Sequence, residues 1–256
     1  MNDLDLAILL ANAADEISLT RFRSVDLLVE TKPDRTPVTD ADKAVELKLR
    51  QIIDLHSPGD GVIGEEFENT LGSERVWIID PIDGTANYLR GLPIWASLIA
   101  LRENGIITTS VVSAPALGRR WWAKLGNGAF TKDVDGSVRS LDVSKVADLG
   151  DSSISYNSMQ QWDQAGMLEN LISLSRKVWR TRAFGDFLSY MYLAEGSIDM
   201  VCEHDLKIHD IAALVPIILE AGGSITDLFG ELTEDSSSIL ATNSLLHRSF
   251  QSELTT

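Results

Sequence analysis

The strongest constraint on the fold is the stretch Val76-Trp77-Ile78-Ile79-Asp80-Pro81-Ile82-Asp83-Gly84-Thr85-Ala86-Asn87-Tyr88. Its four apolar first residues predict a buried strand. We expect this strand to end at Asp80, because Pro81 has no backbone donor and a fixed φ angle. Gly84 and Thr85 then indicate the start of a helix. Carboxylates placed between a buried strand and the free N–H groups of a helix suit a divalent cation together with a phosphate.

The same residues also fit a simple turn. Asp83 followed by Gly84 is a common turn pair, and the Asp83 side chain could cap the helix that follows. Short motifs of this kind also occur without the function they suggest. The rest of the chain therefore has to decide between a cation site and a turn.

Net charge narrows the class of partner. The chain has 256 residues, enough for one large or two modest domains. It carries 38 acidic and 22 basic residues, a formal net charge of −16, which argues against nucleic acid or an anionic membrane as the main partner. A small phosphorylated metabolite remains compatible with this charge, provided that metal ions lie between the acids and the phosphate.

Cysteine content and the first residues bear on the compartment. Cys202 is the only cysteine, so an intrachain disulfide and a cysteine-rich zinc site are both excluded. Residues 1–5 are acidic and lack the basic start of a signal peptide. No apolar run approaches transmembrane length. These features together predict a cytoplasmic protein.

The chain is expected to begin with a long helix. Apolar residues at helical spacing predict it over residues 3–30. A loop over residues 32–38 follows and contains two prolines. Because this loop directly precedes Asp42, its closure over a substrate is a question worth testing.

A second helix is predicted after this loop. Thr39 or Asp40 caps it, and Asp42 lies in its first turn. On these residues alone, Asp42 could simply interact with the helix dipole. Lys43 and Glu46 are expected on the solvent-exposed face of the helix.

Two adjacent acids, Glu65 and Glu66, follow a short strand that ends at Gly64. Neighbouring side chains on an extended chain point to opposite sides. One of these acids can therefore face a site while the other faces solvent or a basic partner. A surface acidic loop is the alternative.

The pattern of elements changes near residue 143. Before it, the strands predicted at 95–101, 106–113 and 119–124 form hairpins, which indicates an antiparallel sheet covered by helices. After it, strands and helices alternate, as is typical of an α/β fold. The strands are expected at 153–156, 177–179, 198–202, 224–227 and 239–242, and the helices at 167–174, 185–194, 211–220 and 245–254. We therefore expect an α+β part over residues 1–142 and an α/β part over residues 143–256.

Further candidate residues stand at helix starts in the second part. Asp210 follows His209 and is expected to open the helix over residues 211–220. Asp186 likewise precedes a helix. Each of these acids could be an ordinary N-cap. Spacing alone does not show that acids from such distant positions meet at one site.

Three segments carry a resemblance to a known family. They are Gly64-Glu65-Glu66, Trp77 to Tyr88, and His209-Asp210-Ile211-Ala212-Ala213 followed by Glu220-Ala221-Gly222-Gly223. In this order, and over nearly the whole chain, they resemble the inositol monophosphatase family. That family contains magnesium-dependent, lithium-sensitive phosphatases, and it implies a layered αβαβα sandwich like that of fructose-bisphosphatase. His209 departs from the tryptophan that the family has at this place.

The resemblance implies a set of ligands for two to three Mg²⁺ ions. The first ion would be held by Glu65, Asp80 and the carbonyl of Ile82. The second would be held by Asp80, Asp83 and Asp210, and a third, weaker ion by Glu65 with help from Asp42. Carboxylate and carbonyl oxygens suit Mg²⁺ rather than zinc.

The resemblance also implies how the reaction proceeds. Thr85, with Asp42 or Glu65, would orient the attacking water, and Asp83, Gly84 and Thr85 would bind the phosphate. The metal ions would make water a usable nucleophile toward the phosphate and would stabilise the leaving alkoxide. No serine, histidine or cysteine nucleophile is required.

Four residues would select the leaving group: Arg182, Gly185, Asp186 and Glu203. An aspartate after this glycine is similar to the branch of the family that hydrolyses histidinol phosphate. A carboxylate can pair with the amine or the imidazole of histidinol, whereas inositol offers no cation. The expected reaction is therefore the conversion of L-histidinol phosphate to L-histidinol and phosphate, a step of histidine biosynthesis.

Other functions remain open at this point. The first alternative is a phosphatase for inositol 1-phosphate or for a broad range of sugar phosphates. A nucleotide bisphosphatase fits less well, because Ala86-Asn87-Tyr88 is unlike that branch. A catalytically silent protein that binds metal or a phosphometabolite belongs to a different class. The family is commonly dimeric, so a homodimer is expected.

Overall fold

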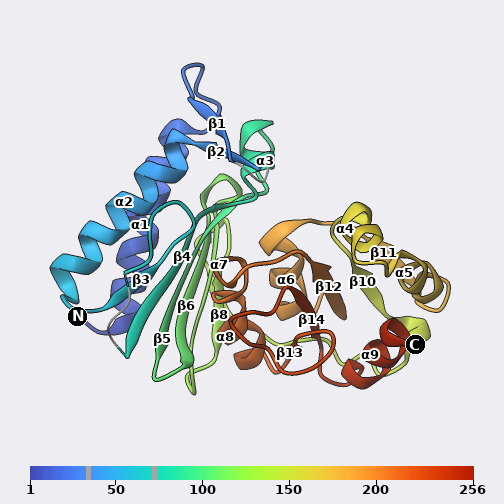
Figure 1. Ribbon diagram of the computed structural model, residues 1–256. Helices are drawn as coiled ribbons and strands as arrows, with labels where there is room; N and C mark the ends of the chain where they lie inside the picture. The colour runs from blue at the N-terminus through green and yellow to red at the C-terminus, as the bar shows by residue number, and fades with distance from the viewer. Residues whose placement is uncertain (33–35, 71–73) are drawn as a thin grey trace.

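The computed structural model describes residues 1–32, 36–70 and 74–256. Whether the predicted loop closes over a substrate depends in part on residues 33–35, which lie outside the described residues. Layers of helix and sheet alternate across the molecule, from α1 and α2 on the left of Figure 1 to α4, α5 and α9 on the right. The predicted αβαβα sandwich is thereby confirmed.

The first helix layer contains α1 (Asp3–Arg21) and α2 (Asp40–His56). The prediction that the first helix reaches residue 30 was wrong. Phe22 adopts an extended conformation and Arg23 has a φ of 60°, so the helix stops. The Phe22 ring then packs between Tyr88 and Trp95, with ring centroids 5.3 Å away in each case. Burial of this ring outweighs continuation of the helix.

A small two-stranded sheet joins these helices. It consists of β1 (Val29–Thr31) and β2 (Pro37–Thr39), which pair antiparallel. Thr39 at its end is the N-cap of α2, and its hydroxyl accepts the N–H groups of Ala41 and Asp42. The predicted cap is therefore confirmed.

The larger sheet has seven strands in the order β3-β4-β5-β6-β7-β8-β9. Their bounds are Gly61–Ile63, Arg75–Asp83, Ala96–Glu103, Ile106–Ala114, Arg119–Lys124, Ala129–Lys132 and Val138–Ser140. Strands β3 and β4 are parallel, and the remaining pairs are antiparallel, as the hairpin pattern predicted. Side chains of β4 alternate between the two faces: Trp77 joins the core under α1 and α2, and Ile78 joins the core on the other side.

Strand β4 continues through Pro81 to Asp83, so the predicted end at Asp80 was wrong. Asp80 lies opposite Leu98, whereas Asp83 lies opposite Ala96, which leaves an extra residue in β4 and makes a bulge. A bulge tolerates Pro81 because its missing N–H is not needed there. The strand thereby delivers both carboxylates at its end.

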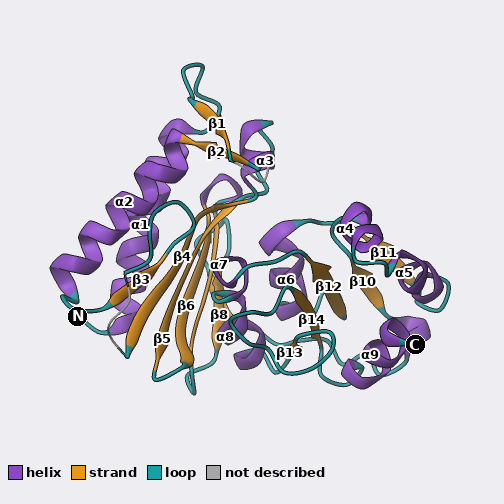
Figure 2. Cartoon of the chain, in the orientation of Figure 1, coloured by secondary structure: helices purple, strands orange, loops and turns teal. Residues whose placement is uncertain are grey.

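The second sheet has five strands in the order β11-β10-β12-β14-β13. Their bounds, from β10 to β14, are Ser153–Ser155, Arg180–Arg182, Met200–His204, Ser224–Thr226 and Ser238–Thr242. Between the sheets lie α6 (Asp186–Ala194), α7 (Ile208–Ile211) and α8 (Leu214–Glu220), and Figure 2 shows them between the two sets of strands. A short helix, α3 (Thr85–Leu89), follows β4.

The outer layer covers the second sheet. It contains α4 (Met159–Gln164), α5 (Leu168–Ser175) and α9 (His247–Thr255), which share a core with β10, β12 and β14. Short 3₁₀ helices lie at Pro115–Leu117 and Leu149–Asp151. In the described part of the chain, no helix is long and apolar enough to cross a membrane.

Some elements of the second half differ from the prediction. The strand predicted at 177–179 lies at Arg180–Arg182, and Trp179 is exposed instead. The helix predicted to open at Asp210 begins at Ile208. Asp210 occupies its third position and accepts the N–H of Lys207 at 2.7 Å, so it caps the helix from inside.

Both halves contribute to the core between the sheets. It contains Ile78 and Trp121 from the first half and Met191 and Ile217 from the second. The division into residues 1–142 and 143–256 stays a prediction.

The contact of Tyr88 with α1 leads to a stability prediction. The Tyr88 hydroxyl donates to the carbonyl of Ser18 at 2.7 Å, in a buried setting. We expect Tyr88→Phe to lower the free energy of unfolding by about 1 kcal/mol, because one buried hydrogen bond is lost and the Ser18 carbonyl keeps only the N–H of Phe22. Urea denaturation measures the change. Tyr192→Phe, on a half-buried ring that packs against Phe184, is the control and should change stability by less than about 0.5 kcal/mol. Equal changes in the two variants would contradict this role.

Candidate active site

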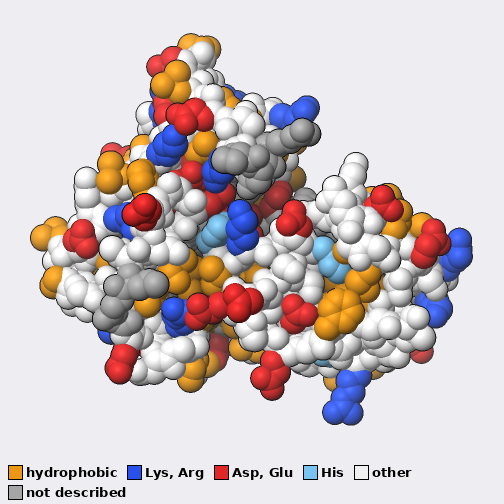
Figure 3. Space-filling model, in the orientation of Figure 1, with side chains coloured by type: hydrophobic (Ala, Val, Ile, Leu, Met, Phe, Trp, Pro, Cys, Tyr) orange, Lys and Arg blue, Asp and Glu red, His pale blue; other side chains and the backbone are white. Residues whose placement is uncertain are grey.

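One cavity of about 560 Å³ gathers most of the predicted site residues. Those that line it are Glu65, Asp80, Ile82, Asp83, Gly84, Thr85, Asp186, Glu203 and Asp210. In the space-filling view the surface is hollowed between the two halves, with acidic and histidine side chains in the hollow (Figure 3). Segments from both halves of the chain therefore meet at this cavity.

Three carboxylates at the base of the cavity form a compact cluster. Asp80, Asp83 and Asp210 each offer an oxygen, and these oxygens all lie within 4.8 Å of one another. Oδ1 of Asp80 is buried and has no hydrogen-bond partner in the structure. Burial raises the pKa of each of the three carboxyls, and neighbouring carboxylates raise those of Asp80 and Asp83 further.

This arrangement fits a divalent cation. A bound cation would give the unpartnered oxygen of Asp80 a ligand bond and would offset the repulsion within the cluster. The donor set consists of oxygen atoms only, which suits a hard ion. The cluster can therefore hold a metal ion and bring it to a phosphate in the cavity.

Main-chain donors orient two members of the cluster. The N–H of Phe187, in the first turn of α6, donates to Oδ2 of Asp83 at 2.9 Å. The N–H of Lys207 donates to Oδ2 of Asp210 at 2.7 Å. The position of each carboxylate is thus fixed by a backbone N–H at the start of a helix, α6 for Asp83 and α7 for Asp210.

Thr85 and Asp42 meet beside the cluster. The Thr85 hydroxyl lies 3.0 Å from the carbonyl oxygen of Ile82 and 3.3 Å from Oδ1 of Asp42, and it can donate to one of them at a time. Oδ2 of Asp42 accepts the N–H of Thr39 at 2.8 Å. Asp42 is fully buried, and burial raises the pKa of its carboxyl to about 6. It therefore acts on the cavity through Thr85 rather than by lining it.

Glu65 and Glu66 share a partner, which corrects the prediction that they point to opposite sides. Nζ of Lys32 lies 2.7 Å from Oε1 of each. The chain bends over residues 65–67 instead of running extended, so both side chains turn toward the lysine. Burial raises the pKa of Glu66 to about 7. Lys32 was not predicted as a site residue, although it is the kind of basic partner expected for one of these acids.

Glu46 is the clearest error of the sequence analysis. It was expected in solvent, yet it is fully buried and forms an ion pair with Arg50. It lies four residues after Asp42, so both occupy the same face of α2. That face turns toward the Gly64 bend, where Oε2 of Glu46 accepts the N–H of Glu66 at 2.8 Å.

Asp186 lies where α6 begins and lines the same cavity as the cluster, near enough to Asp83 for its charge to raise the pKa of that carboxyl. Its φ angle is 50°, and Gly185 before it has a φ of 86°. Oδ2 of Asp186 accepts from the side-chain amide of Asn87 at 2.6 Å, so the Val76–Tyr88 stretch orients this acid directly. Burial raises the pKa of the Asp186 carboxyl to about 6. This role of Asn87 was not predicted from the sequence.

Glu203 lies close by on β12. It is buried and lies beside the Tyr190 hydroxyl. Burial raises the Glu203 pKa first, and the charge of Asp186 raises it further. In contrast, the structure does not bring Arg182 to the cavity: its guanidinium donates to the carbonyl of Thr181 at 2.7 Å on the surface.

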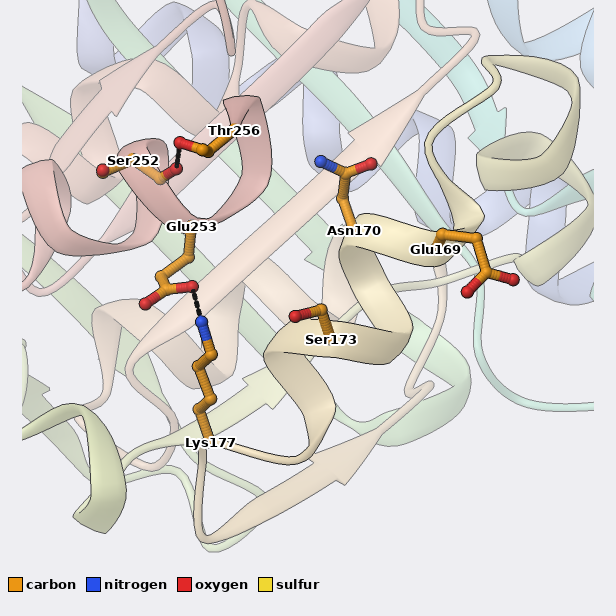
Figure 4. A pocket seen from close by; sticks show the side chains of 7 residues that line it. All are labelled: Glu169, Asn170, Ser173, Lys177, Ser252, Glu253 and Thr256. Carbon is orange, nitrogen blue, oxygen red and sulfur yellow. Dashed lines mark hydrogen bonds and ion pairs between the residues drawn. The ribbon is translucent and has the colours of Figure 1, made fainter.

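A second pocket of about 530 Å³ lies between α5 and α9 (Figure 4). An ion pair between Lys177 and Glu253 crosses it. Its lining shares no residue with the carboxylate cluster, and its side chains are those of ordinary polar surface. We assign it no chemistry.

Comparisons with known proteins agree with this geometry. The model of the inositol monophosphatase family matches residues 2–255. A histidinol-phosphatase of Mycobacterium tuberculosis is 52% identical over 248 residues, which are 96% of this chain and 95% of that protein. A histidinol-phosphatase of Streptomyces coelicolor is 49% identical over 251 residues, 96% of this chain and 94% of that protein.

A solved structure supports the same assignment. The extragenic suppressor protein suhB of Bartonella henselae superimposes with a TM-score of 0.89 and is 29% identical, covering 98% of this chain and 97% of that one. With the family matched over residues 2–255 and the carboxylates gathered in one cavity, the chain belongs to the inositol monophosphatase family and is a phosphatase.

Proposed function

We propose that this protein hydrolyses L-histidinol phosphate to L-histidinol and phosphate with Mg²⁺ at the carboxylate cluster. The observation that carries the choice of substrate is the pair Asp186 and Glu203. Both carboxyls line the cavity without belonging to the cluster, and neither forms an ion pair among the described residues. Acids placed in this way favour a cationic leaving group, and histidinol carries an amine and an imidazole.

The names of the relatives support the same substrate. Those of Mycobacterium tuberculosis and Streptomyces coelicolor are called histidinol-phosphatases, and each matches this chain over almost its whole length. Phosphatases for inositol 1-phosphate or sugar phosphates hydrolyse esters whose leaving group is a neutral polyol. An inositol ring would offer neither acid a counter-charge.

We propose these roles for the residues around the metal. Asp80, Asp83, Asp210, the Ile82 carbonyl and Glu65 would hold two to three ions, and Asp42 would assist Glu65. When bound, Mg²⁺ supplies positive charge to the phosphoryl group and lowers the pKa of water. Asp83, Gly84 and Thr85 would position the phosphate, and Thr85 with Asp42 or Glu65 would orient the water.

Two further expectations stay predictions. The expected homodimer rests on the family being commonly dimeric, and the structure describes one chain. The cytoplasmic location rests on the single buried Cys202 and on the reaction proposed, whose substrate would be a metabolite of the cell interior.

The first prediction concerns the metal. We expect Asp83→Asn to abolish phosphate release, because the second ion loses a charged ligand. Folding should survive, since an amide oxygen can still accept the Phe187 N–H and removal of a charge relieves repulsion from Asp186 and Asp210. Thermal unfolding should show an unchanged or higher midpoint without metal and a smaller rise on addition of Mg²⁺.

Asp199→Asn is the matched control. Asp199 is also buried and also accepts a backbone N–H, that of Ser153 at 2.6 Å, but it lies outside the cavity. This variant should keep its activity and its response to Mg²⁺. Near-normal turnover of Asp83→Asn at saturating Mg²⁺ would show the proposed metal site to be wrong.

The second prediction concerns the leaving group. Asp186→Asn should lower kcat/KM for L-histidinol phosphate by about tenfold to a hundredfold, because a hydrogen bond to a charged group contributes roughly 1.5–3 kcal/mol. Asparagine is preferable to alanine here, because it tolerates the positive φ of residue 186. It can also still accept from Asn87.

The comparison is made within one variant. Steady-state kinetics with L-histidinol phosphate, inositol 1-phosphate and p-nitrophenyl phosphate should show the loss on the first substrate only. A loss of the same size on all three substrates would mean that Asp186 supports the site in general and does not select histidinol.

A further inference from the structure

We propose that Glu46 and Arg50 act as a positioning pair that holds the bend over residues 64–70, and with it Glu65, in the geometry that binds metal. Neither residue touches the cavity. The inference rests on the proposed role of Glu65 as a metal ligand. It assigns a task to a buried carboxylate that lies outside the cluster.

Glu46 is inserted into the bend. Its side chain is fully buried, and its Oε2 accepts the N–H of Glu66 at 2.8 Å. A Cβ atom on Gly64 would lie 2.0 Å from its Oε1, so only a glycine admits the carboxylate at this distance. The peptide that joins Glu65 to Glu66 is therefore fixed by Glu46, and the direction of the Glu65 side chain follows from it.

Arg50 holds the other end of the same bend. Its Nε and Nη2 donate to Oε1 of Glu46 at 2.9 and 2.7 Å. Its Nη1 donates to the Thr70 hydroxyl at 3.2 Å, and its Nη2 reaches the carbonyl of Phe67 at 3.4 Å. Thr70 in turn pairs with Val62 through two backbone hydrogen bonds of 2.9 Å. The pair thus ties the bend to α2 at its middle and its end.

The pair extends a row on α2 that begins at the site. Asp42, Glu46 and Arg50 follow one another at intervals of four residues, so they occupy one face of the helix. Asp42 meets Thr85, and Glu46 meets the Glu65 bend. One rigid helix face therefore sets the position of two groups that come from separate segments.

Stability alone does not explain a buried ion pair. Apolar side chains of similar size in place of such a pair are often neutral or stabilising, because desolvation of the charges is costly. The direct bond from Glu46 to the backbone beside Glu65 supports the positioning role instead. Groups that orient metal ligands typically change metal affinity about 10–100-fold when they are removed.

The test replaces both charges by methionine, as Glu46→Met with Arg50→Met. This double variant keeps the packing, leaves no unpaired buried charge and removes the bond to the Glu66 N–H. We expect the metal-free protein to unfold at nearly the wild-type temperature. Calorimetric titration of the metal-free double variant with Mg²⁺ should show an affinity at least about tenfold weaker than that of the wild type. The fold increase in the Mg²⁺ concentration that gives half-maximal activity should exceed the fold decrease in kcat.

A matched control removes a comparable pair elsewhere. Arg119 and Glu195 form a largely buried ion pair at 2.7 Å, and neither lines the cavity. Arg119→Met with Glu195→Met should leave Mg²⁺ affinity unchanged, whatever its effect on the unfolding temperature. An equal loss of affinity in both double variants would overturn the proposal.

Other outcomes are equally decisive. Wild-type Mg²⁺ affinity in the Glu46/Arg50 double variant would overturn the positioning role and leave the proposed function intact. If wild-type protein neither binds Mg²⁺ nor releases phosphate, the proposed function itself has failed. Should the double variant not fold, Glu46→Gln takes its place, because glutamine keeps the volume and loses an acceptor. A several-fold weaker Mg²⁺ affinity there supports the role, and unchanged affinity rejects it.

Discussion

The mutual repulsion of buried carboxylates is the constraint on which the rest of this structure depends. Asp80, Asp83 and Asp210 offer oxygens within 4.8 Å of one another, in a place where burial already disfavours charge. Such a cluster opposes folding unless something holds it. The protein holds it with main-chain N–H groups from Phe187 and Lys207. The cluster therefore exists only once the helices that carry those donors have docked.

The layered fold brings the three carboxylates together from different layers. Asp80 and Asp83 come from the first sheet, whereas Phe187 and Asp210 come from helices α6 and α7 between the sheets. The middle core must form before the ligands meet, because residues of both halves build it. Stability and the proposed metal binding would thus be coupled through the same interface. The bulge in β4 is the local device that makes this meeting possible, since it turns two acids out of one strand.

The sequence predicted much of this arrangement and missed parts that depend on packing. Alternating and apolar runs identified the strands of the larger sheet up to β7 but not β8 and β9, and the resemblance named acids that the structure gathers in one cavity. Local patterns could not show that Phe22 leaves the helix to join Tyr88 and Trp95, or that β4 passes through Pro81. Glu46 resembled a surface residue because its partner, the Gly64 bend, is distant in sequence and becomes a neighbour only in the fold.

Asn87 links the part of the site proposed to bind metal with the part proposed to recognise the leaving group. Asn87 belongs to the stretch that delivers Asp80 and Asp83, and its amide binds Asp186, on the side of the cavity proposed to meet the leaving group. Asp186 in turn precedes Phe187, whose N–H holds Asp83. A substitution at residue 186 that displaces the peptide between residues 186 and 187 would therefore disturb the hydrogen bond to Asp83. A side chain at position 186 can therefore select a substrate only if it leaves the peptide between residues 186 and 187 in place. An aspartate bound by Asn87 satisfies this condition and presents a carboxyl to the cavity.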